Sequence, residues 1–176
     1  MTASDVDDWS VQLLVDGFGR VRDSVRTVVD GLDPDELAWR PSGTGNSIAW
    51  LVWHLTRVQD DHLAGAAGEE QVWTQDGWSK RFGLPFDDAE TGYGQTSSDV
   101  DAVRVRSGEL LRSYHDAVHD QTVRQLRSWH EDALAQVVDE GWDPPVTLAV
   151  RLVSVLADAL AHAGQAEYVR GLLPAD

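Results

Sequence analysis

A run of polar residues near the C-terminus recurs at helical spacing within an otherwise apolar segment. Its members are Thr147, Arg151, Ser154, Asp158, His162 and Gln165. Because steps of three and four residues return to the same side of an α-helix, these side chains form one narrow stripe. Asp158 and His162 stand one turn apart on it, where a carboxylate and an imidazole can bind the same cation. The stripe therefore predicts half of a metal site.

The alternative interpretation is that the stripe is simply the solvent-exposed face of an amphipathic helix. Such a face should be broad and rich in charged residues in a chain of this composition. The stripe is narrow instead, and it is flanked by the small residues Ala157, Ala159, Ala161 and Ala163. Small side chains suit a cleft between closely packed helices. Taken alone, the stripe leaves both interpretations open.

A third ligand would have to come from another segment, and His54 in the sequence WLVWHLTR is the candidate. At 100° per residue, His54 lies at the edge of the apolar stripe formed by Ile48, Leu51 and Leu55. This boundary is where a ligand that faces an interhelical cleft belongs. The alternative is a partly exposed histidine that bonds to water or to a neighbour.

His115 and His119 form a second pair with the same one-turn spacing. They lie beside Arg112, Asp116 and Asp120, away from the apolar positions of their segment. This pattern predicts a solvent-exposed face rather than a second metal site.

The apolar periodicity of the chain predicts four long helices. They cover about residues 11–32, 46–65, 96–126 and 147–172, with a short helical piece after Ser128. A long loop, residues 65–96, is expected between the second and third helices because no period is sustained there. No alternating strand pattern is present, so the fold class is all-α, a four-helix bundle.

Composition limits the classes of function. The 176 residues fit a single domain, residues 1–176, and 30 acidic against 14 basic residues give a net charge of −16. Such a charge argues against nucleic acid and anionic membrane surfaces as partners. The chain contains no cysteine, so thiol chemistry would need a thiol from outside. We expect a cytoplasmic protein, because the N-terminal segment is acidic and no apolar run of about 20 residues is present.

Two segments placed on helices resemble a known family. The segment NSIAWLVWHL and the later run D-x-x-x-H-A-G-Q resemble the DinB-like (YfiT-like) superfamily of metal-binding four-helix proteins. The loop segments DGWSKRFGLPF and TGYGQTS are similar to sequences of its actinobacterial branch. This branch includes mycothiol-dependent maleylpyruvate isomerase and mycothiol S-transferases. The resemblance covers nearly the whole chain and implies a divalent metal held by His54, Asp158 and His162. Zinc is the first expectation, with nickel or iron as alternatives. The isomerase-like pattern has Glu where this chain has Asp158, so this shorter side chain must lie closer to the ion.

The implied donor set leaves at least one coordination position open, as in catalytic zinc sites. By resemblance, mycothiol would bind there as a metal-bound thiolate nucleophile and attack a small electrophile, in an S-transfer or a cis–trans isomerisation. Arg57 and Arg151 are candidates for orienting an anionic substrate, and ordinary surface salt bridges are the alternative for both. A metal-dependent hydrolase and a non-catalytic metal-binding stress protein are the competing functions.

The segment 70–96 is rich in aromatic residues. Trp73 and Trp78 could form a lid, a dimer contact or a tethered loop. We expect a homodimer on the strength of this segment.

Overall fold

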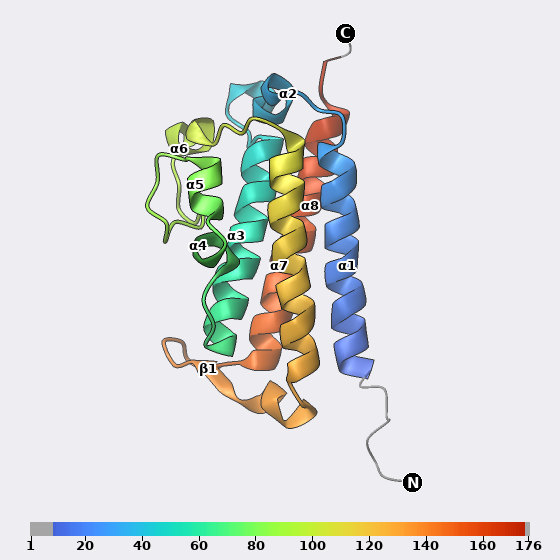
Figure 1. Cartoon of the computed structure of the whole chain (residues 1–176), viewed down its shortest axis with the longest axis vertical. Coiled ribbons are helices and arrows are strands. Elements are labelled where there is room, and N and C mark those ends of the chain that lie inside the picture. The colour runs from blue at the N-terminus through green and yellow to red at the C-terminus, as the bar shows by residue number, and fades with distance from the viewer. Residues whose placement is uncertain (1–8, 175–176) are drawn as a thin grey trace.

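Four long helices dominate the computed structural model, which describes residues 9–174 (Figure 1). They are α1 (Trp9–Val29), α3 (Ile48–Ala67), α7 (Gly108–Ser128) and α8 (Leu148–Gly171). The short helices are α2 (Pro34–Ala38), η1 (Pro41–Gly43), α4 (Val72–Gln75), α5 (Trp78–Phe82), α6 (Ser97–Ala102) and η2 (Glu131–Ala135). Two short antiparallel strands, β1 (Val137–Asp139) and β2 (Val146–Thr147), form the sheet. The predicted all-α fold class is confirmed. In the described part of the chain, no helix is long and apolar enough to cross a membrane.

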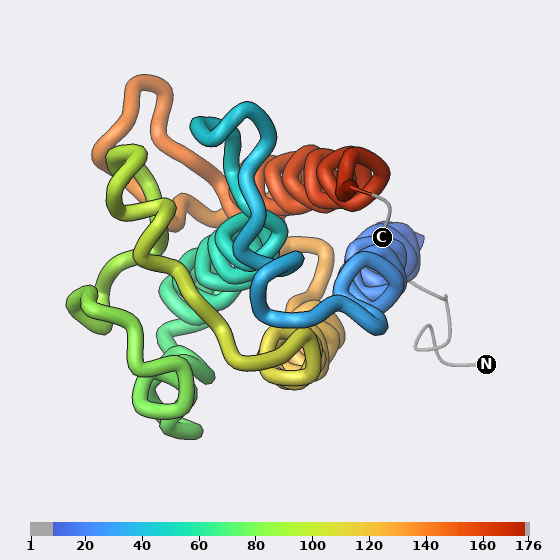
Figure 2. The backbone as a smooth tube through the Cα atoms, turned by 90° about the horizontal axis from the view of Figure 1, so that it is seen from above, coloured from blue at the N-terminus to red at the C-terminus, as the bar shows by residue number. Residues whose placement is uncertain are grey.

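The long helices form a four-cornered bundle. Helices α1 and α8 run in one direction and α3 and α7 in the other (Figure 1). Helix α3 packs against α7 and α8, and α1 completes the bundle by packing against the same two helices. Seen from above, α4, α5 and α6 lie on the outer side of α3 (Figure 2). The apolar faces of the four long helices enclose the main core. Packing in this core fixes the position of α3 relative to α8.

Local signals fix the ends of the helices that matter for the site. The buried Ser47 hydroxyl accepts a hydrogen bond from the Trp50 amide and so begins α3. Thr147, the first residue of the polar stripe, caps α8 in the same way through the Val150 amide. Gly17 lets α1 approach α8 closely, because a Cβ there would lie 2.7 Å from Leu156 Cδ2.

The predicted third helix is divided in two, which corrects the sequence analysis. Helix α6 ends at Ala102, and α7 begins at Gly108 after Ser107, whose hydroxyl accepts a hydrogen bond from the Leu110 amide. A Cβ on Gly108 would lie 2.4 Å from the Val29 carbonyl oxygen. Gly108 is therefore held against the end of α1, and the chain reaches this point through the non-helical residues 103–107.

The aromatic segment between α3 and α7 is folded against the bundle. Trp73, Trp78 and Phe82 are buried in the main core, where their rings contact Tyr114 of α7. Trp73 and Trp78 were expected to form a lid, a dimer contact or a tethered loop, and their burial favours the tethered loop. These three rings therefore offer little exposed surface for a second protein copy, although Tyr93 in the same segment is 91% exposed.

Candidate metal site

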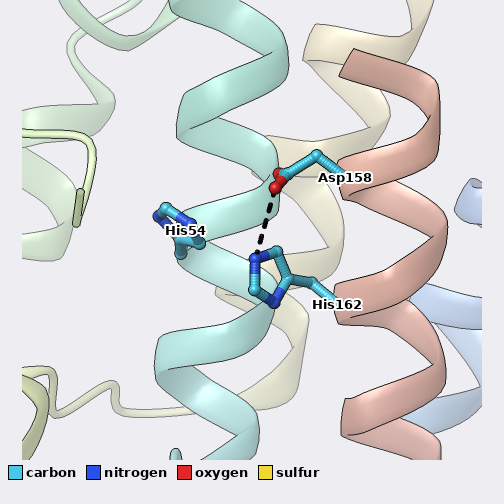
Figure 3. Close-up of side chains that lie close together, drawn as sticks. All are labelled: His54, Asp158 and His162. Carbon is cyan, nitrogen blue, oxygen red and sulfur yellow. Dashed lines mark ion pairs between the residues drawn. The ribbon is translucent and has the colours of Figure 1, made fainter. Parts of the chain in front are cut away.

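Two helices bring the three predicted ligands together. His54 lies on α3, while Asp158 and His162 lie one turn apart on α8 (Figure 3). One ligand atom from each residue lies within 4.8 Å of those of the other two. The ring centroids of the two histidines are 4.8 Å apart. A single cation could therefore contact all three side chains.

Hydrogen bonds fix which nitrogen of each imidazole is free. His54 Nδ1 lies 2.6 Å from the Thr91 carbonyl oxygen, and His162 Nδ1 lies 2.9 Å from Gln165 Oε1. Both oxygens can only accept, so each Nδ1 donates its proton. The remaining nitrogen, Nε2, is the one available for a metal in both residues.

The carboxylate of Asp158 completes the donor set. Its Oδ1 lies 3.5 Å from His162 Nε2. Its Oδ2 is buried and has no hydrogen-bond partner among the described residues. A buried carboxylate oxygen without a donor is costly unless a cation neutralises it. The orphaned oxygen and the two free Nε2 atoms together fit a divalent cation.

The electrostatics of the site act in opposite directions on the pKa values of its two histidines. Burial is the main cause that lowers the pKa of His54, so this imidazole is neutral at neutral pH. The side-chain interaction with His162 lowers the pKa of Asp158, and the same interaction raises the pKa of His162. The interaction with Asp158 thus favours a proton on His162 Nε2, and a cation bound at this nitrogen would have to displace that proton.

Trp50 forms a wall of the site. Its ring stacks on His54, with centroids 4.5 Å apart and an interplanar angle of 18°, and its Nε1 donates to Gln95 Oε1. Trp50 meets the His162 ring edge-on at 6.2 Å. The indole thus restricts the orientation of both imidazoles from one side.

The two arginines expected at the substrate are occupied by partners within the protein. Arg57 is fully buried and donates to the backbone carbonyls of Asp88 and Glu90. Arg151 on α8 forms an ion pair with Asp139 at 2.6 Å and contacts His62 at 3.3 Å. Contact of either arginine with a substrate stays a prediction.

The second histidine pair was expected on an exposed face, and this expectation is wrong. His115 is 1% exposed and His119 is 5% exposed. Helix α7 packs against α1 and α3 together, which buries a wider arc of it than the apolar stripe alone indicates. His115 Nδ1 lies 3.0 Å from the Thr56 hydroxyl of α3, and Asp116 pairs with Arg26 of α1 at 2.9 Å. Among the described residues, no third ligand joins this histidine pair.

Sequence reasoning also missed residues that surround the ligands. Trp50 could have been found, because it precedes His54 by one helical turn. Gln165 was in the stripe, but its bond to His162 was not foreseen. Thr91 and Gly92 come from the long loop, and no local pattern indicates where that loop docks.

Comparisons with known proteins identify a matching family and a similar solved structure. A family model described as mycothiol-S-transferase matches residues 13–175. The crystal structure of a conserved protein from Enterococcus faecalis superposes with a TM-score of 0.85 and 30% sequence identity, covering 90% of this chain and 94% of that one. No curated protein matches the chain. The family match spans the helices that carry His54, Asp158 and His162.

Proposed function

The chain belongs to the mycothiol-S-transferase family of DinB-like proteins, and from this premise we propose that it transfers the thiol of mycothiol to a small electrophile with the help of a divalent metal. Family membership supports a mycothiol-related transferase. The metal dependence is the further step, and one observation carries it. Ligand atoms of His54, Asp158 and His162 lie within 4.8 Å of one another. We favour zinc because two imidazoles and a carboxylate are a catalytic zinc donor set.

In the proposed reaction, the sulfur of mycothiol forms a bond to carbon as the leaving group departs with its electron pair, and the thiol proton passes to solvent. A divalent cation, when bound, would lower the pKa of a coordinated thiol so that the thiolate is available near neutral pH. His54, Asp158 and His162 would hold it. The hydrogen bonds that the two histidines make through Nδ1, to Thr91 and Gln165, keep both imidazoles in the orientation that leaves Nε2 free. Trp50 covers one side of the site.

We propose Arg151 as a contact for an anionic group of the electrophile, since it lies on the same stripe of α8 as the two ligands. Such a contact would compete with the Asp139 carboxylate. For Arg57 we propose a role in positioning the loop whose carbonyls it binds. We also propose that the whole chain acts as one domain, because the four long helices share a core.

The test is a transfer assay with mycothiol and monobromobimane, run on protein purified without a histidine tag. We expect about one metal ion per chain and a rate that falls on chelation and returns with zinc. His162→Ala should lose the metal and lower the rate at least about 100-fold while its helical content is retained. His130→Ala is the matched control, because this histidine precedes η2 and lies outside the site.

Wild-type protein that transfers the thiol equally well without metal would contradict the metal-dependent mechanism. Hydrolysis that needs metal but no thiol would point to the hydrolase instead. Unfolding of His162→Ala would assign this residue a packing role.

We propose a homodimer that forms through the outer face of α8, rather than through the aromatic segment. Large apolar side chains are exposed along this face at Val150, Val153, Leu160 and Tyr168. The exposed positions between residues 150 and 165 carry no charged side chain. An uncharged face is where two copies with a net charge of −16 can approach each other.

The same face is suited to pairing with itself. Ala157 and Gly164 are exposed small residues that lie between the large ones. In an antiparallel pair of α8 helices related by a twofold axis, Val153 would face Gly164 and Leu160 would face Ala157. Each large side chain would thus meet a small one.

A further inference from the structure

The loop that follows α5 supplies the hydrogen-bond acceptor for one of the ligand histidines. His54 Nδ1 lies 2.6 Å from the Thr91 carbonyl oxygen. This carbonyl can only accept, so the neutral imidazole must carry its proton on Nδ1 and present its lone pair on Nε2. The position of one backbone carbonyl therefore decides which nitrogen of His54 is free.

Arg57 holds the residues that precede this carbonyl. It lies one turn beyond His54 on α3, and its side chain is fully buried. Its Nε donates to the Glu90 carbonyl at 3.1 Å and its Nη2 to the Asp88 carbonyl at 3.1 Å. The planar guanidinium thus bridges two carbonyls of the same loop, which the single ammonium of lysine cannot do with the same geometry.

The buried charge of Arg57 is itself supported. Its Nη1 donates to Gln71 Oε1 at 2.7 Å and lies 3.7 Å from the Asp60 carboxylate. The guanidinium carbon lies 4.9 Å from the centroid of the Trp73 ring. A buried cation is tolerated only when it is paired and hydrogen-bonded in this way. The Arg57 side chain is therefore fixed in position, and its hydrogen bonds fix the loop relative to α3.

Gly92 permits the close approach of the loop to the imidazole. A Cβ at this position would lie 2.6 Å from His54 Nδ1 and 3.1 Å from Trp53 Cζ3. Its φ of +97° is also a conformation that favours glycine. Gly94 has a φ of +73°, but a Cβ there would meet no atom within 4 Å. Only at Gly92 would a side chain push the loop away from the site.

We propose that Arg57 and Gly92 are positioning residues that hold the Thr91 carbonyl against His54 and so fix this imidazole in its Nδ1–H tautomer. The effect of this tautomer on metal binding rests on the proposed function, because the free Nε2 is the atom that would face the cation. Gln165 does the same for His162 from within α8, whereas His54 depends on a segment 37 residues away in the sequence. The long loop is thereby part of the site although it contributes no metal ligand.

The tautomer can be measured directly on the metal-free protein. Long-range ¹H–¹⁵N NMR at pH 7.5 distinguishes a protonated Nδ1 from a protonated Nε2. We expect the Nδ1–H form of His54 in the wild type and in Gly94→Ala. Gly92→Ala and Arg57→Lys should give a mixture of both tautomers. Gly94→Ala is the matched control, because it introduces the same side chain at a positive φ in the same loop without the contact to His54.

Zinc binding provides the second measurement, with zinc sulfate titrated against a chelator. Gly92→Ala and Arg57→Lys should bind zinc about 10-fold or more weakly than the wild type, the usual effect of losing the partner of a ligand histidine. Gly94→Ala should stay within about twofold of the wild type, since the Thr91 carbonyl keeps its place. Circular dichroism checks that each variant is folded.

An Nε2–H tautomer of His54 in the wild type would overturn the proposal. So would equal tautomer populations in Gly92→Ala and Gly94→Ala. If Arg57→Lys does not fold, the comparison of the two glycine variants decides. The expected tautomers together with no zinc binding by any of these proteins would support the positioning role and refute the metal-dependent function, so the two failures are distinguishable.

Discussion

At the scale of single residues, the histidines inside the bundle and at the candidate site differ in how their nitrogens are satisfied. His54 and His162 each donate from Nδ1 and leave Nε2 beside other polar groups of the site. His115 also has a partner at Nδ1, the hydroxyl of Thr56, which itself donates to the Val52 carbonyl. However, His115 Nε2 is buried with no hydrogen-bond partner among the described residues. This nitrogen cannot take up a proton without placing an unpaired charge in the core.

The environment of His115 predicts a loss of stability in acid. Burial, with a smaller contribution from the nearby His119, lowers the pKa of His115 from 6.5 to about 3. The unfolded chain therefore binds a proton in the window between these two values that the folded chain does not. Stability should be fully present above pH 6.5 and should fall as the pH drops below it. From pH 6.5 to 4.5 we expect this group alone to cost roughly 2 to 3 kcal/mol, measured by urea unfolding.

His115→Gln isolates this effect from the carboxylates, which also titrate in acid. Glutamine has no proton to gain in this range, so the pH dependence of the variant should be smaller by about the same amount. Identical slopes for the variant and the wild type would show that His115 is not the group responsible.

At the scale of elements, the rigidity of the site comes from helices and the completion of its hydrogen bonds comes from a loop. Helices α3 and α8 pack side by side and carry all three proposed ligands. Side chains on packed helices keep their relative positions better than side chains on loops. Helix α2 lies in the connection between α1 and α3, at the top of the bundle (Figure 1). This connection determines where α3 starts relative to α1.

The start of α2 should contribute measurably to stability. Asp33 accepts hydrogen bonds from the amides of Asp35 and Glu36, while Glu36 accepts one from the Asp33 amide. Asp33→Ala removes this capping box and should lower the free energy of unfolding by about 1 kcal/mol. The measurement is chemical denaturation at neutral pH.

Asp35→Ala is the matched control for this change. Asp35 is an exposed acidic residue in the same turn, but it takes part in the cap through its amide, whereas the accepting side chains are those of Asp33 and Glu36. It should cost less than about 0.5 kcal/mol. Equal losses for the two variants would indicate a general effect of charge rather than of the cap.

At the scale of the whole molecule, charge and apolar surface are unevenly distributed. The chain has a net charge of −16, yet the outer face of α8 exposes apolar and small residues over most of its length. Exposed apolar stripes of this kind are typical of contact surfaces. This distribution is the basis of the proposed homodimer.

Leu160→Glu should separate the proposed dimer into monomers. It places two like charges near the twofold axis, in addition to the strong negative charge of each copy. We expect sedimentation equilibrium at micromolar concentration to give twice 19.4 kDa for the wild type and 19.4 kDa for the variant. Val137→Glu, at an exposed valine of β1, should leave the dimer intact. A monomeric wild type would refute the proposed homodimer.

The sequence by itself determined the helices and the composition of the candidate site. Periodicity and capping residues are local signals, so α1, α3 and α8 follow closely the expected ranges. The spacing of Asp158 and His162 placed them on one face because a helix repeats every 3.6 residues. His54 could be chosen because its place at the edge of an apolar stripe is also a property of its own helix.

Only the tertiary structure decided what surrounds those residues. The burial of His115 depends on two other helices packing over α7, and the close approach of Gly108 to Val29 depends on how α7 packs against α1. The bond from His54 to Thr91 joins segments that no local pattern relates. Contacts of this kind depend on how whole elements pack, because the free energy that fixes a docked loop comes from distant partners and not from its own sequence.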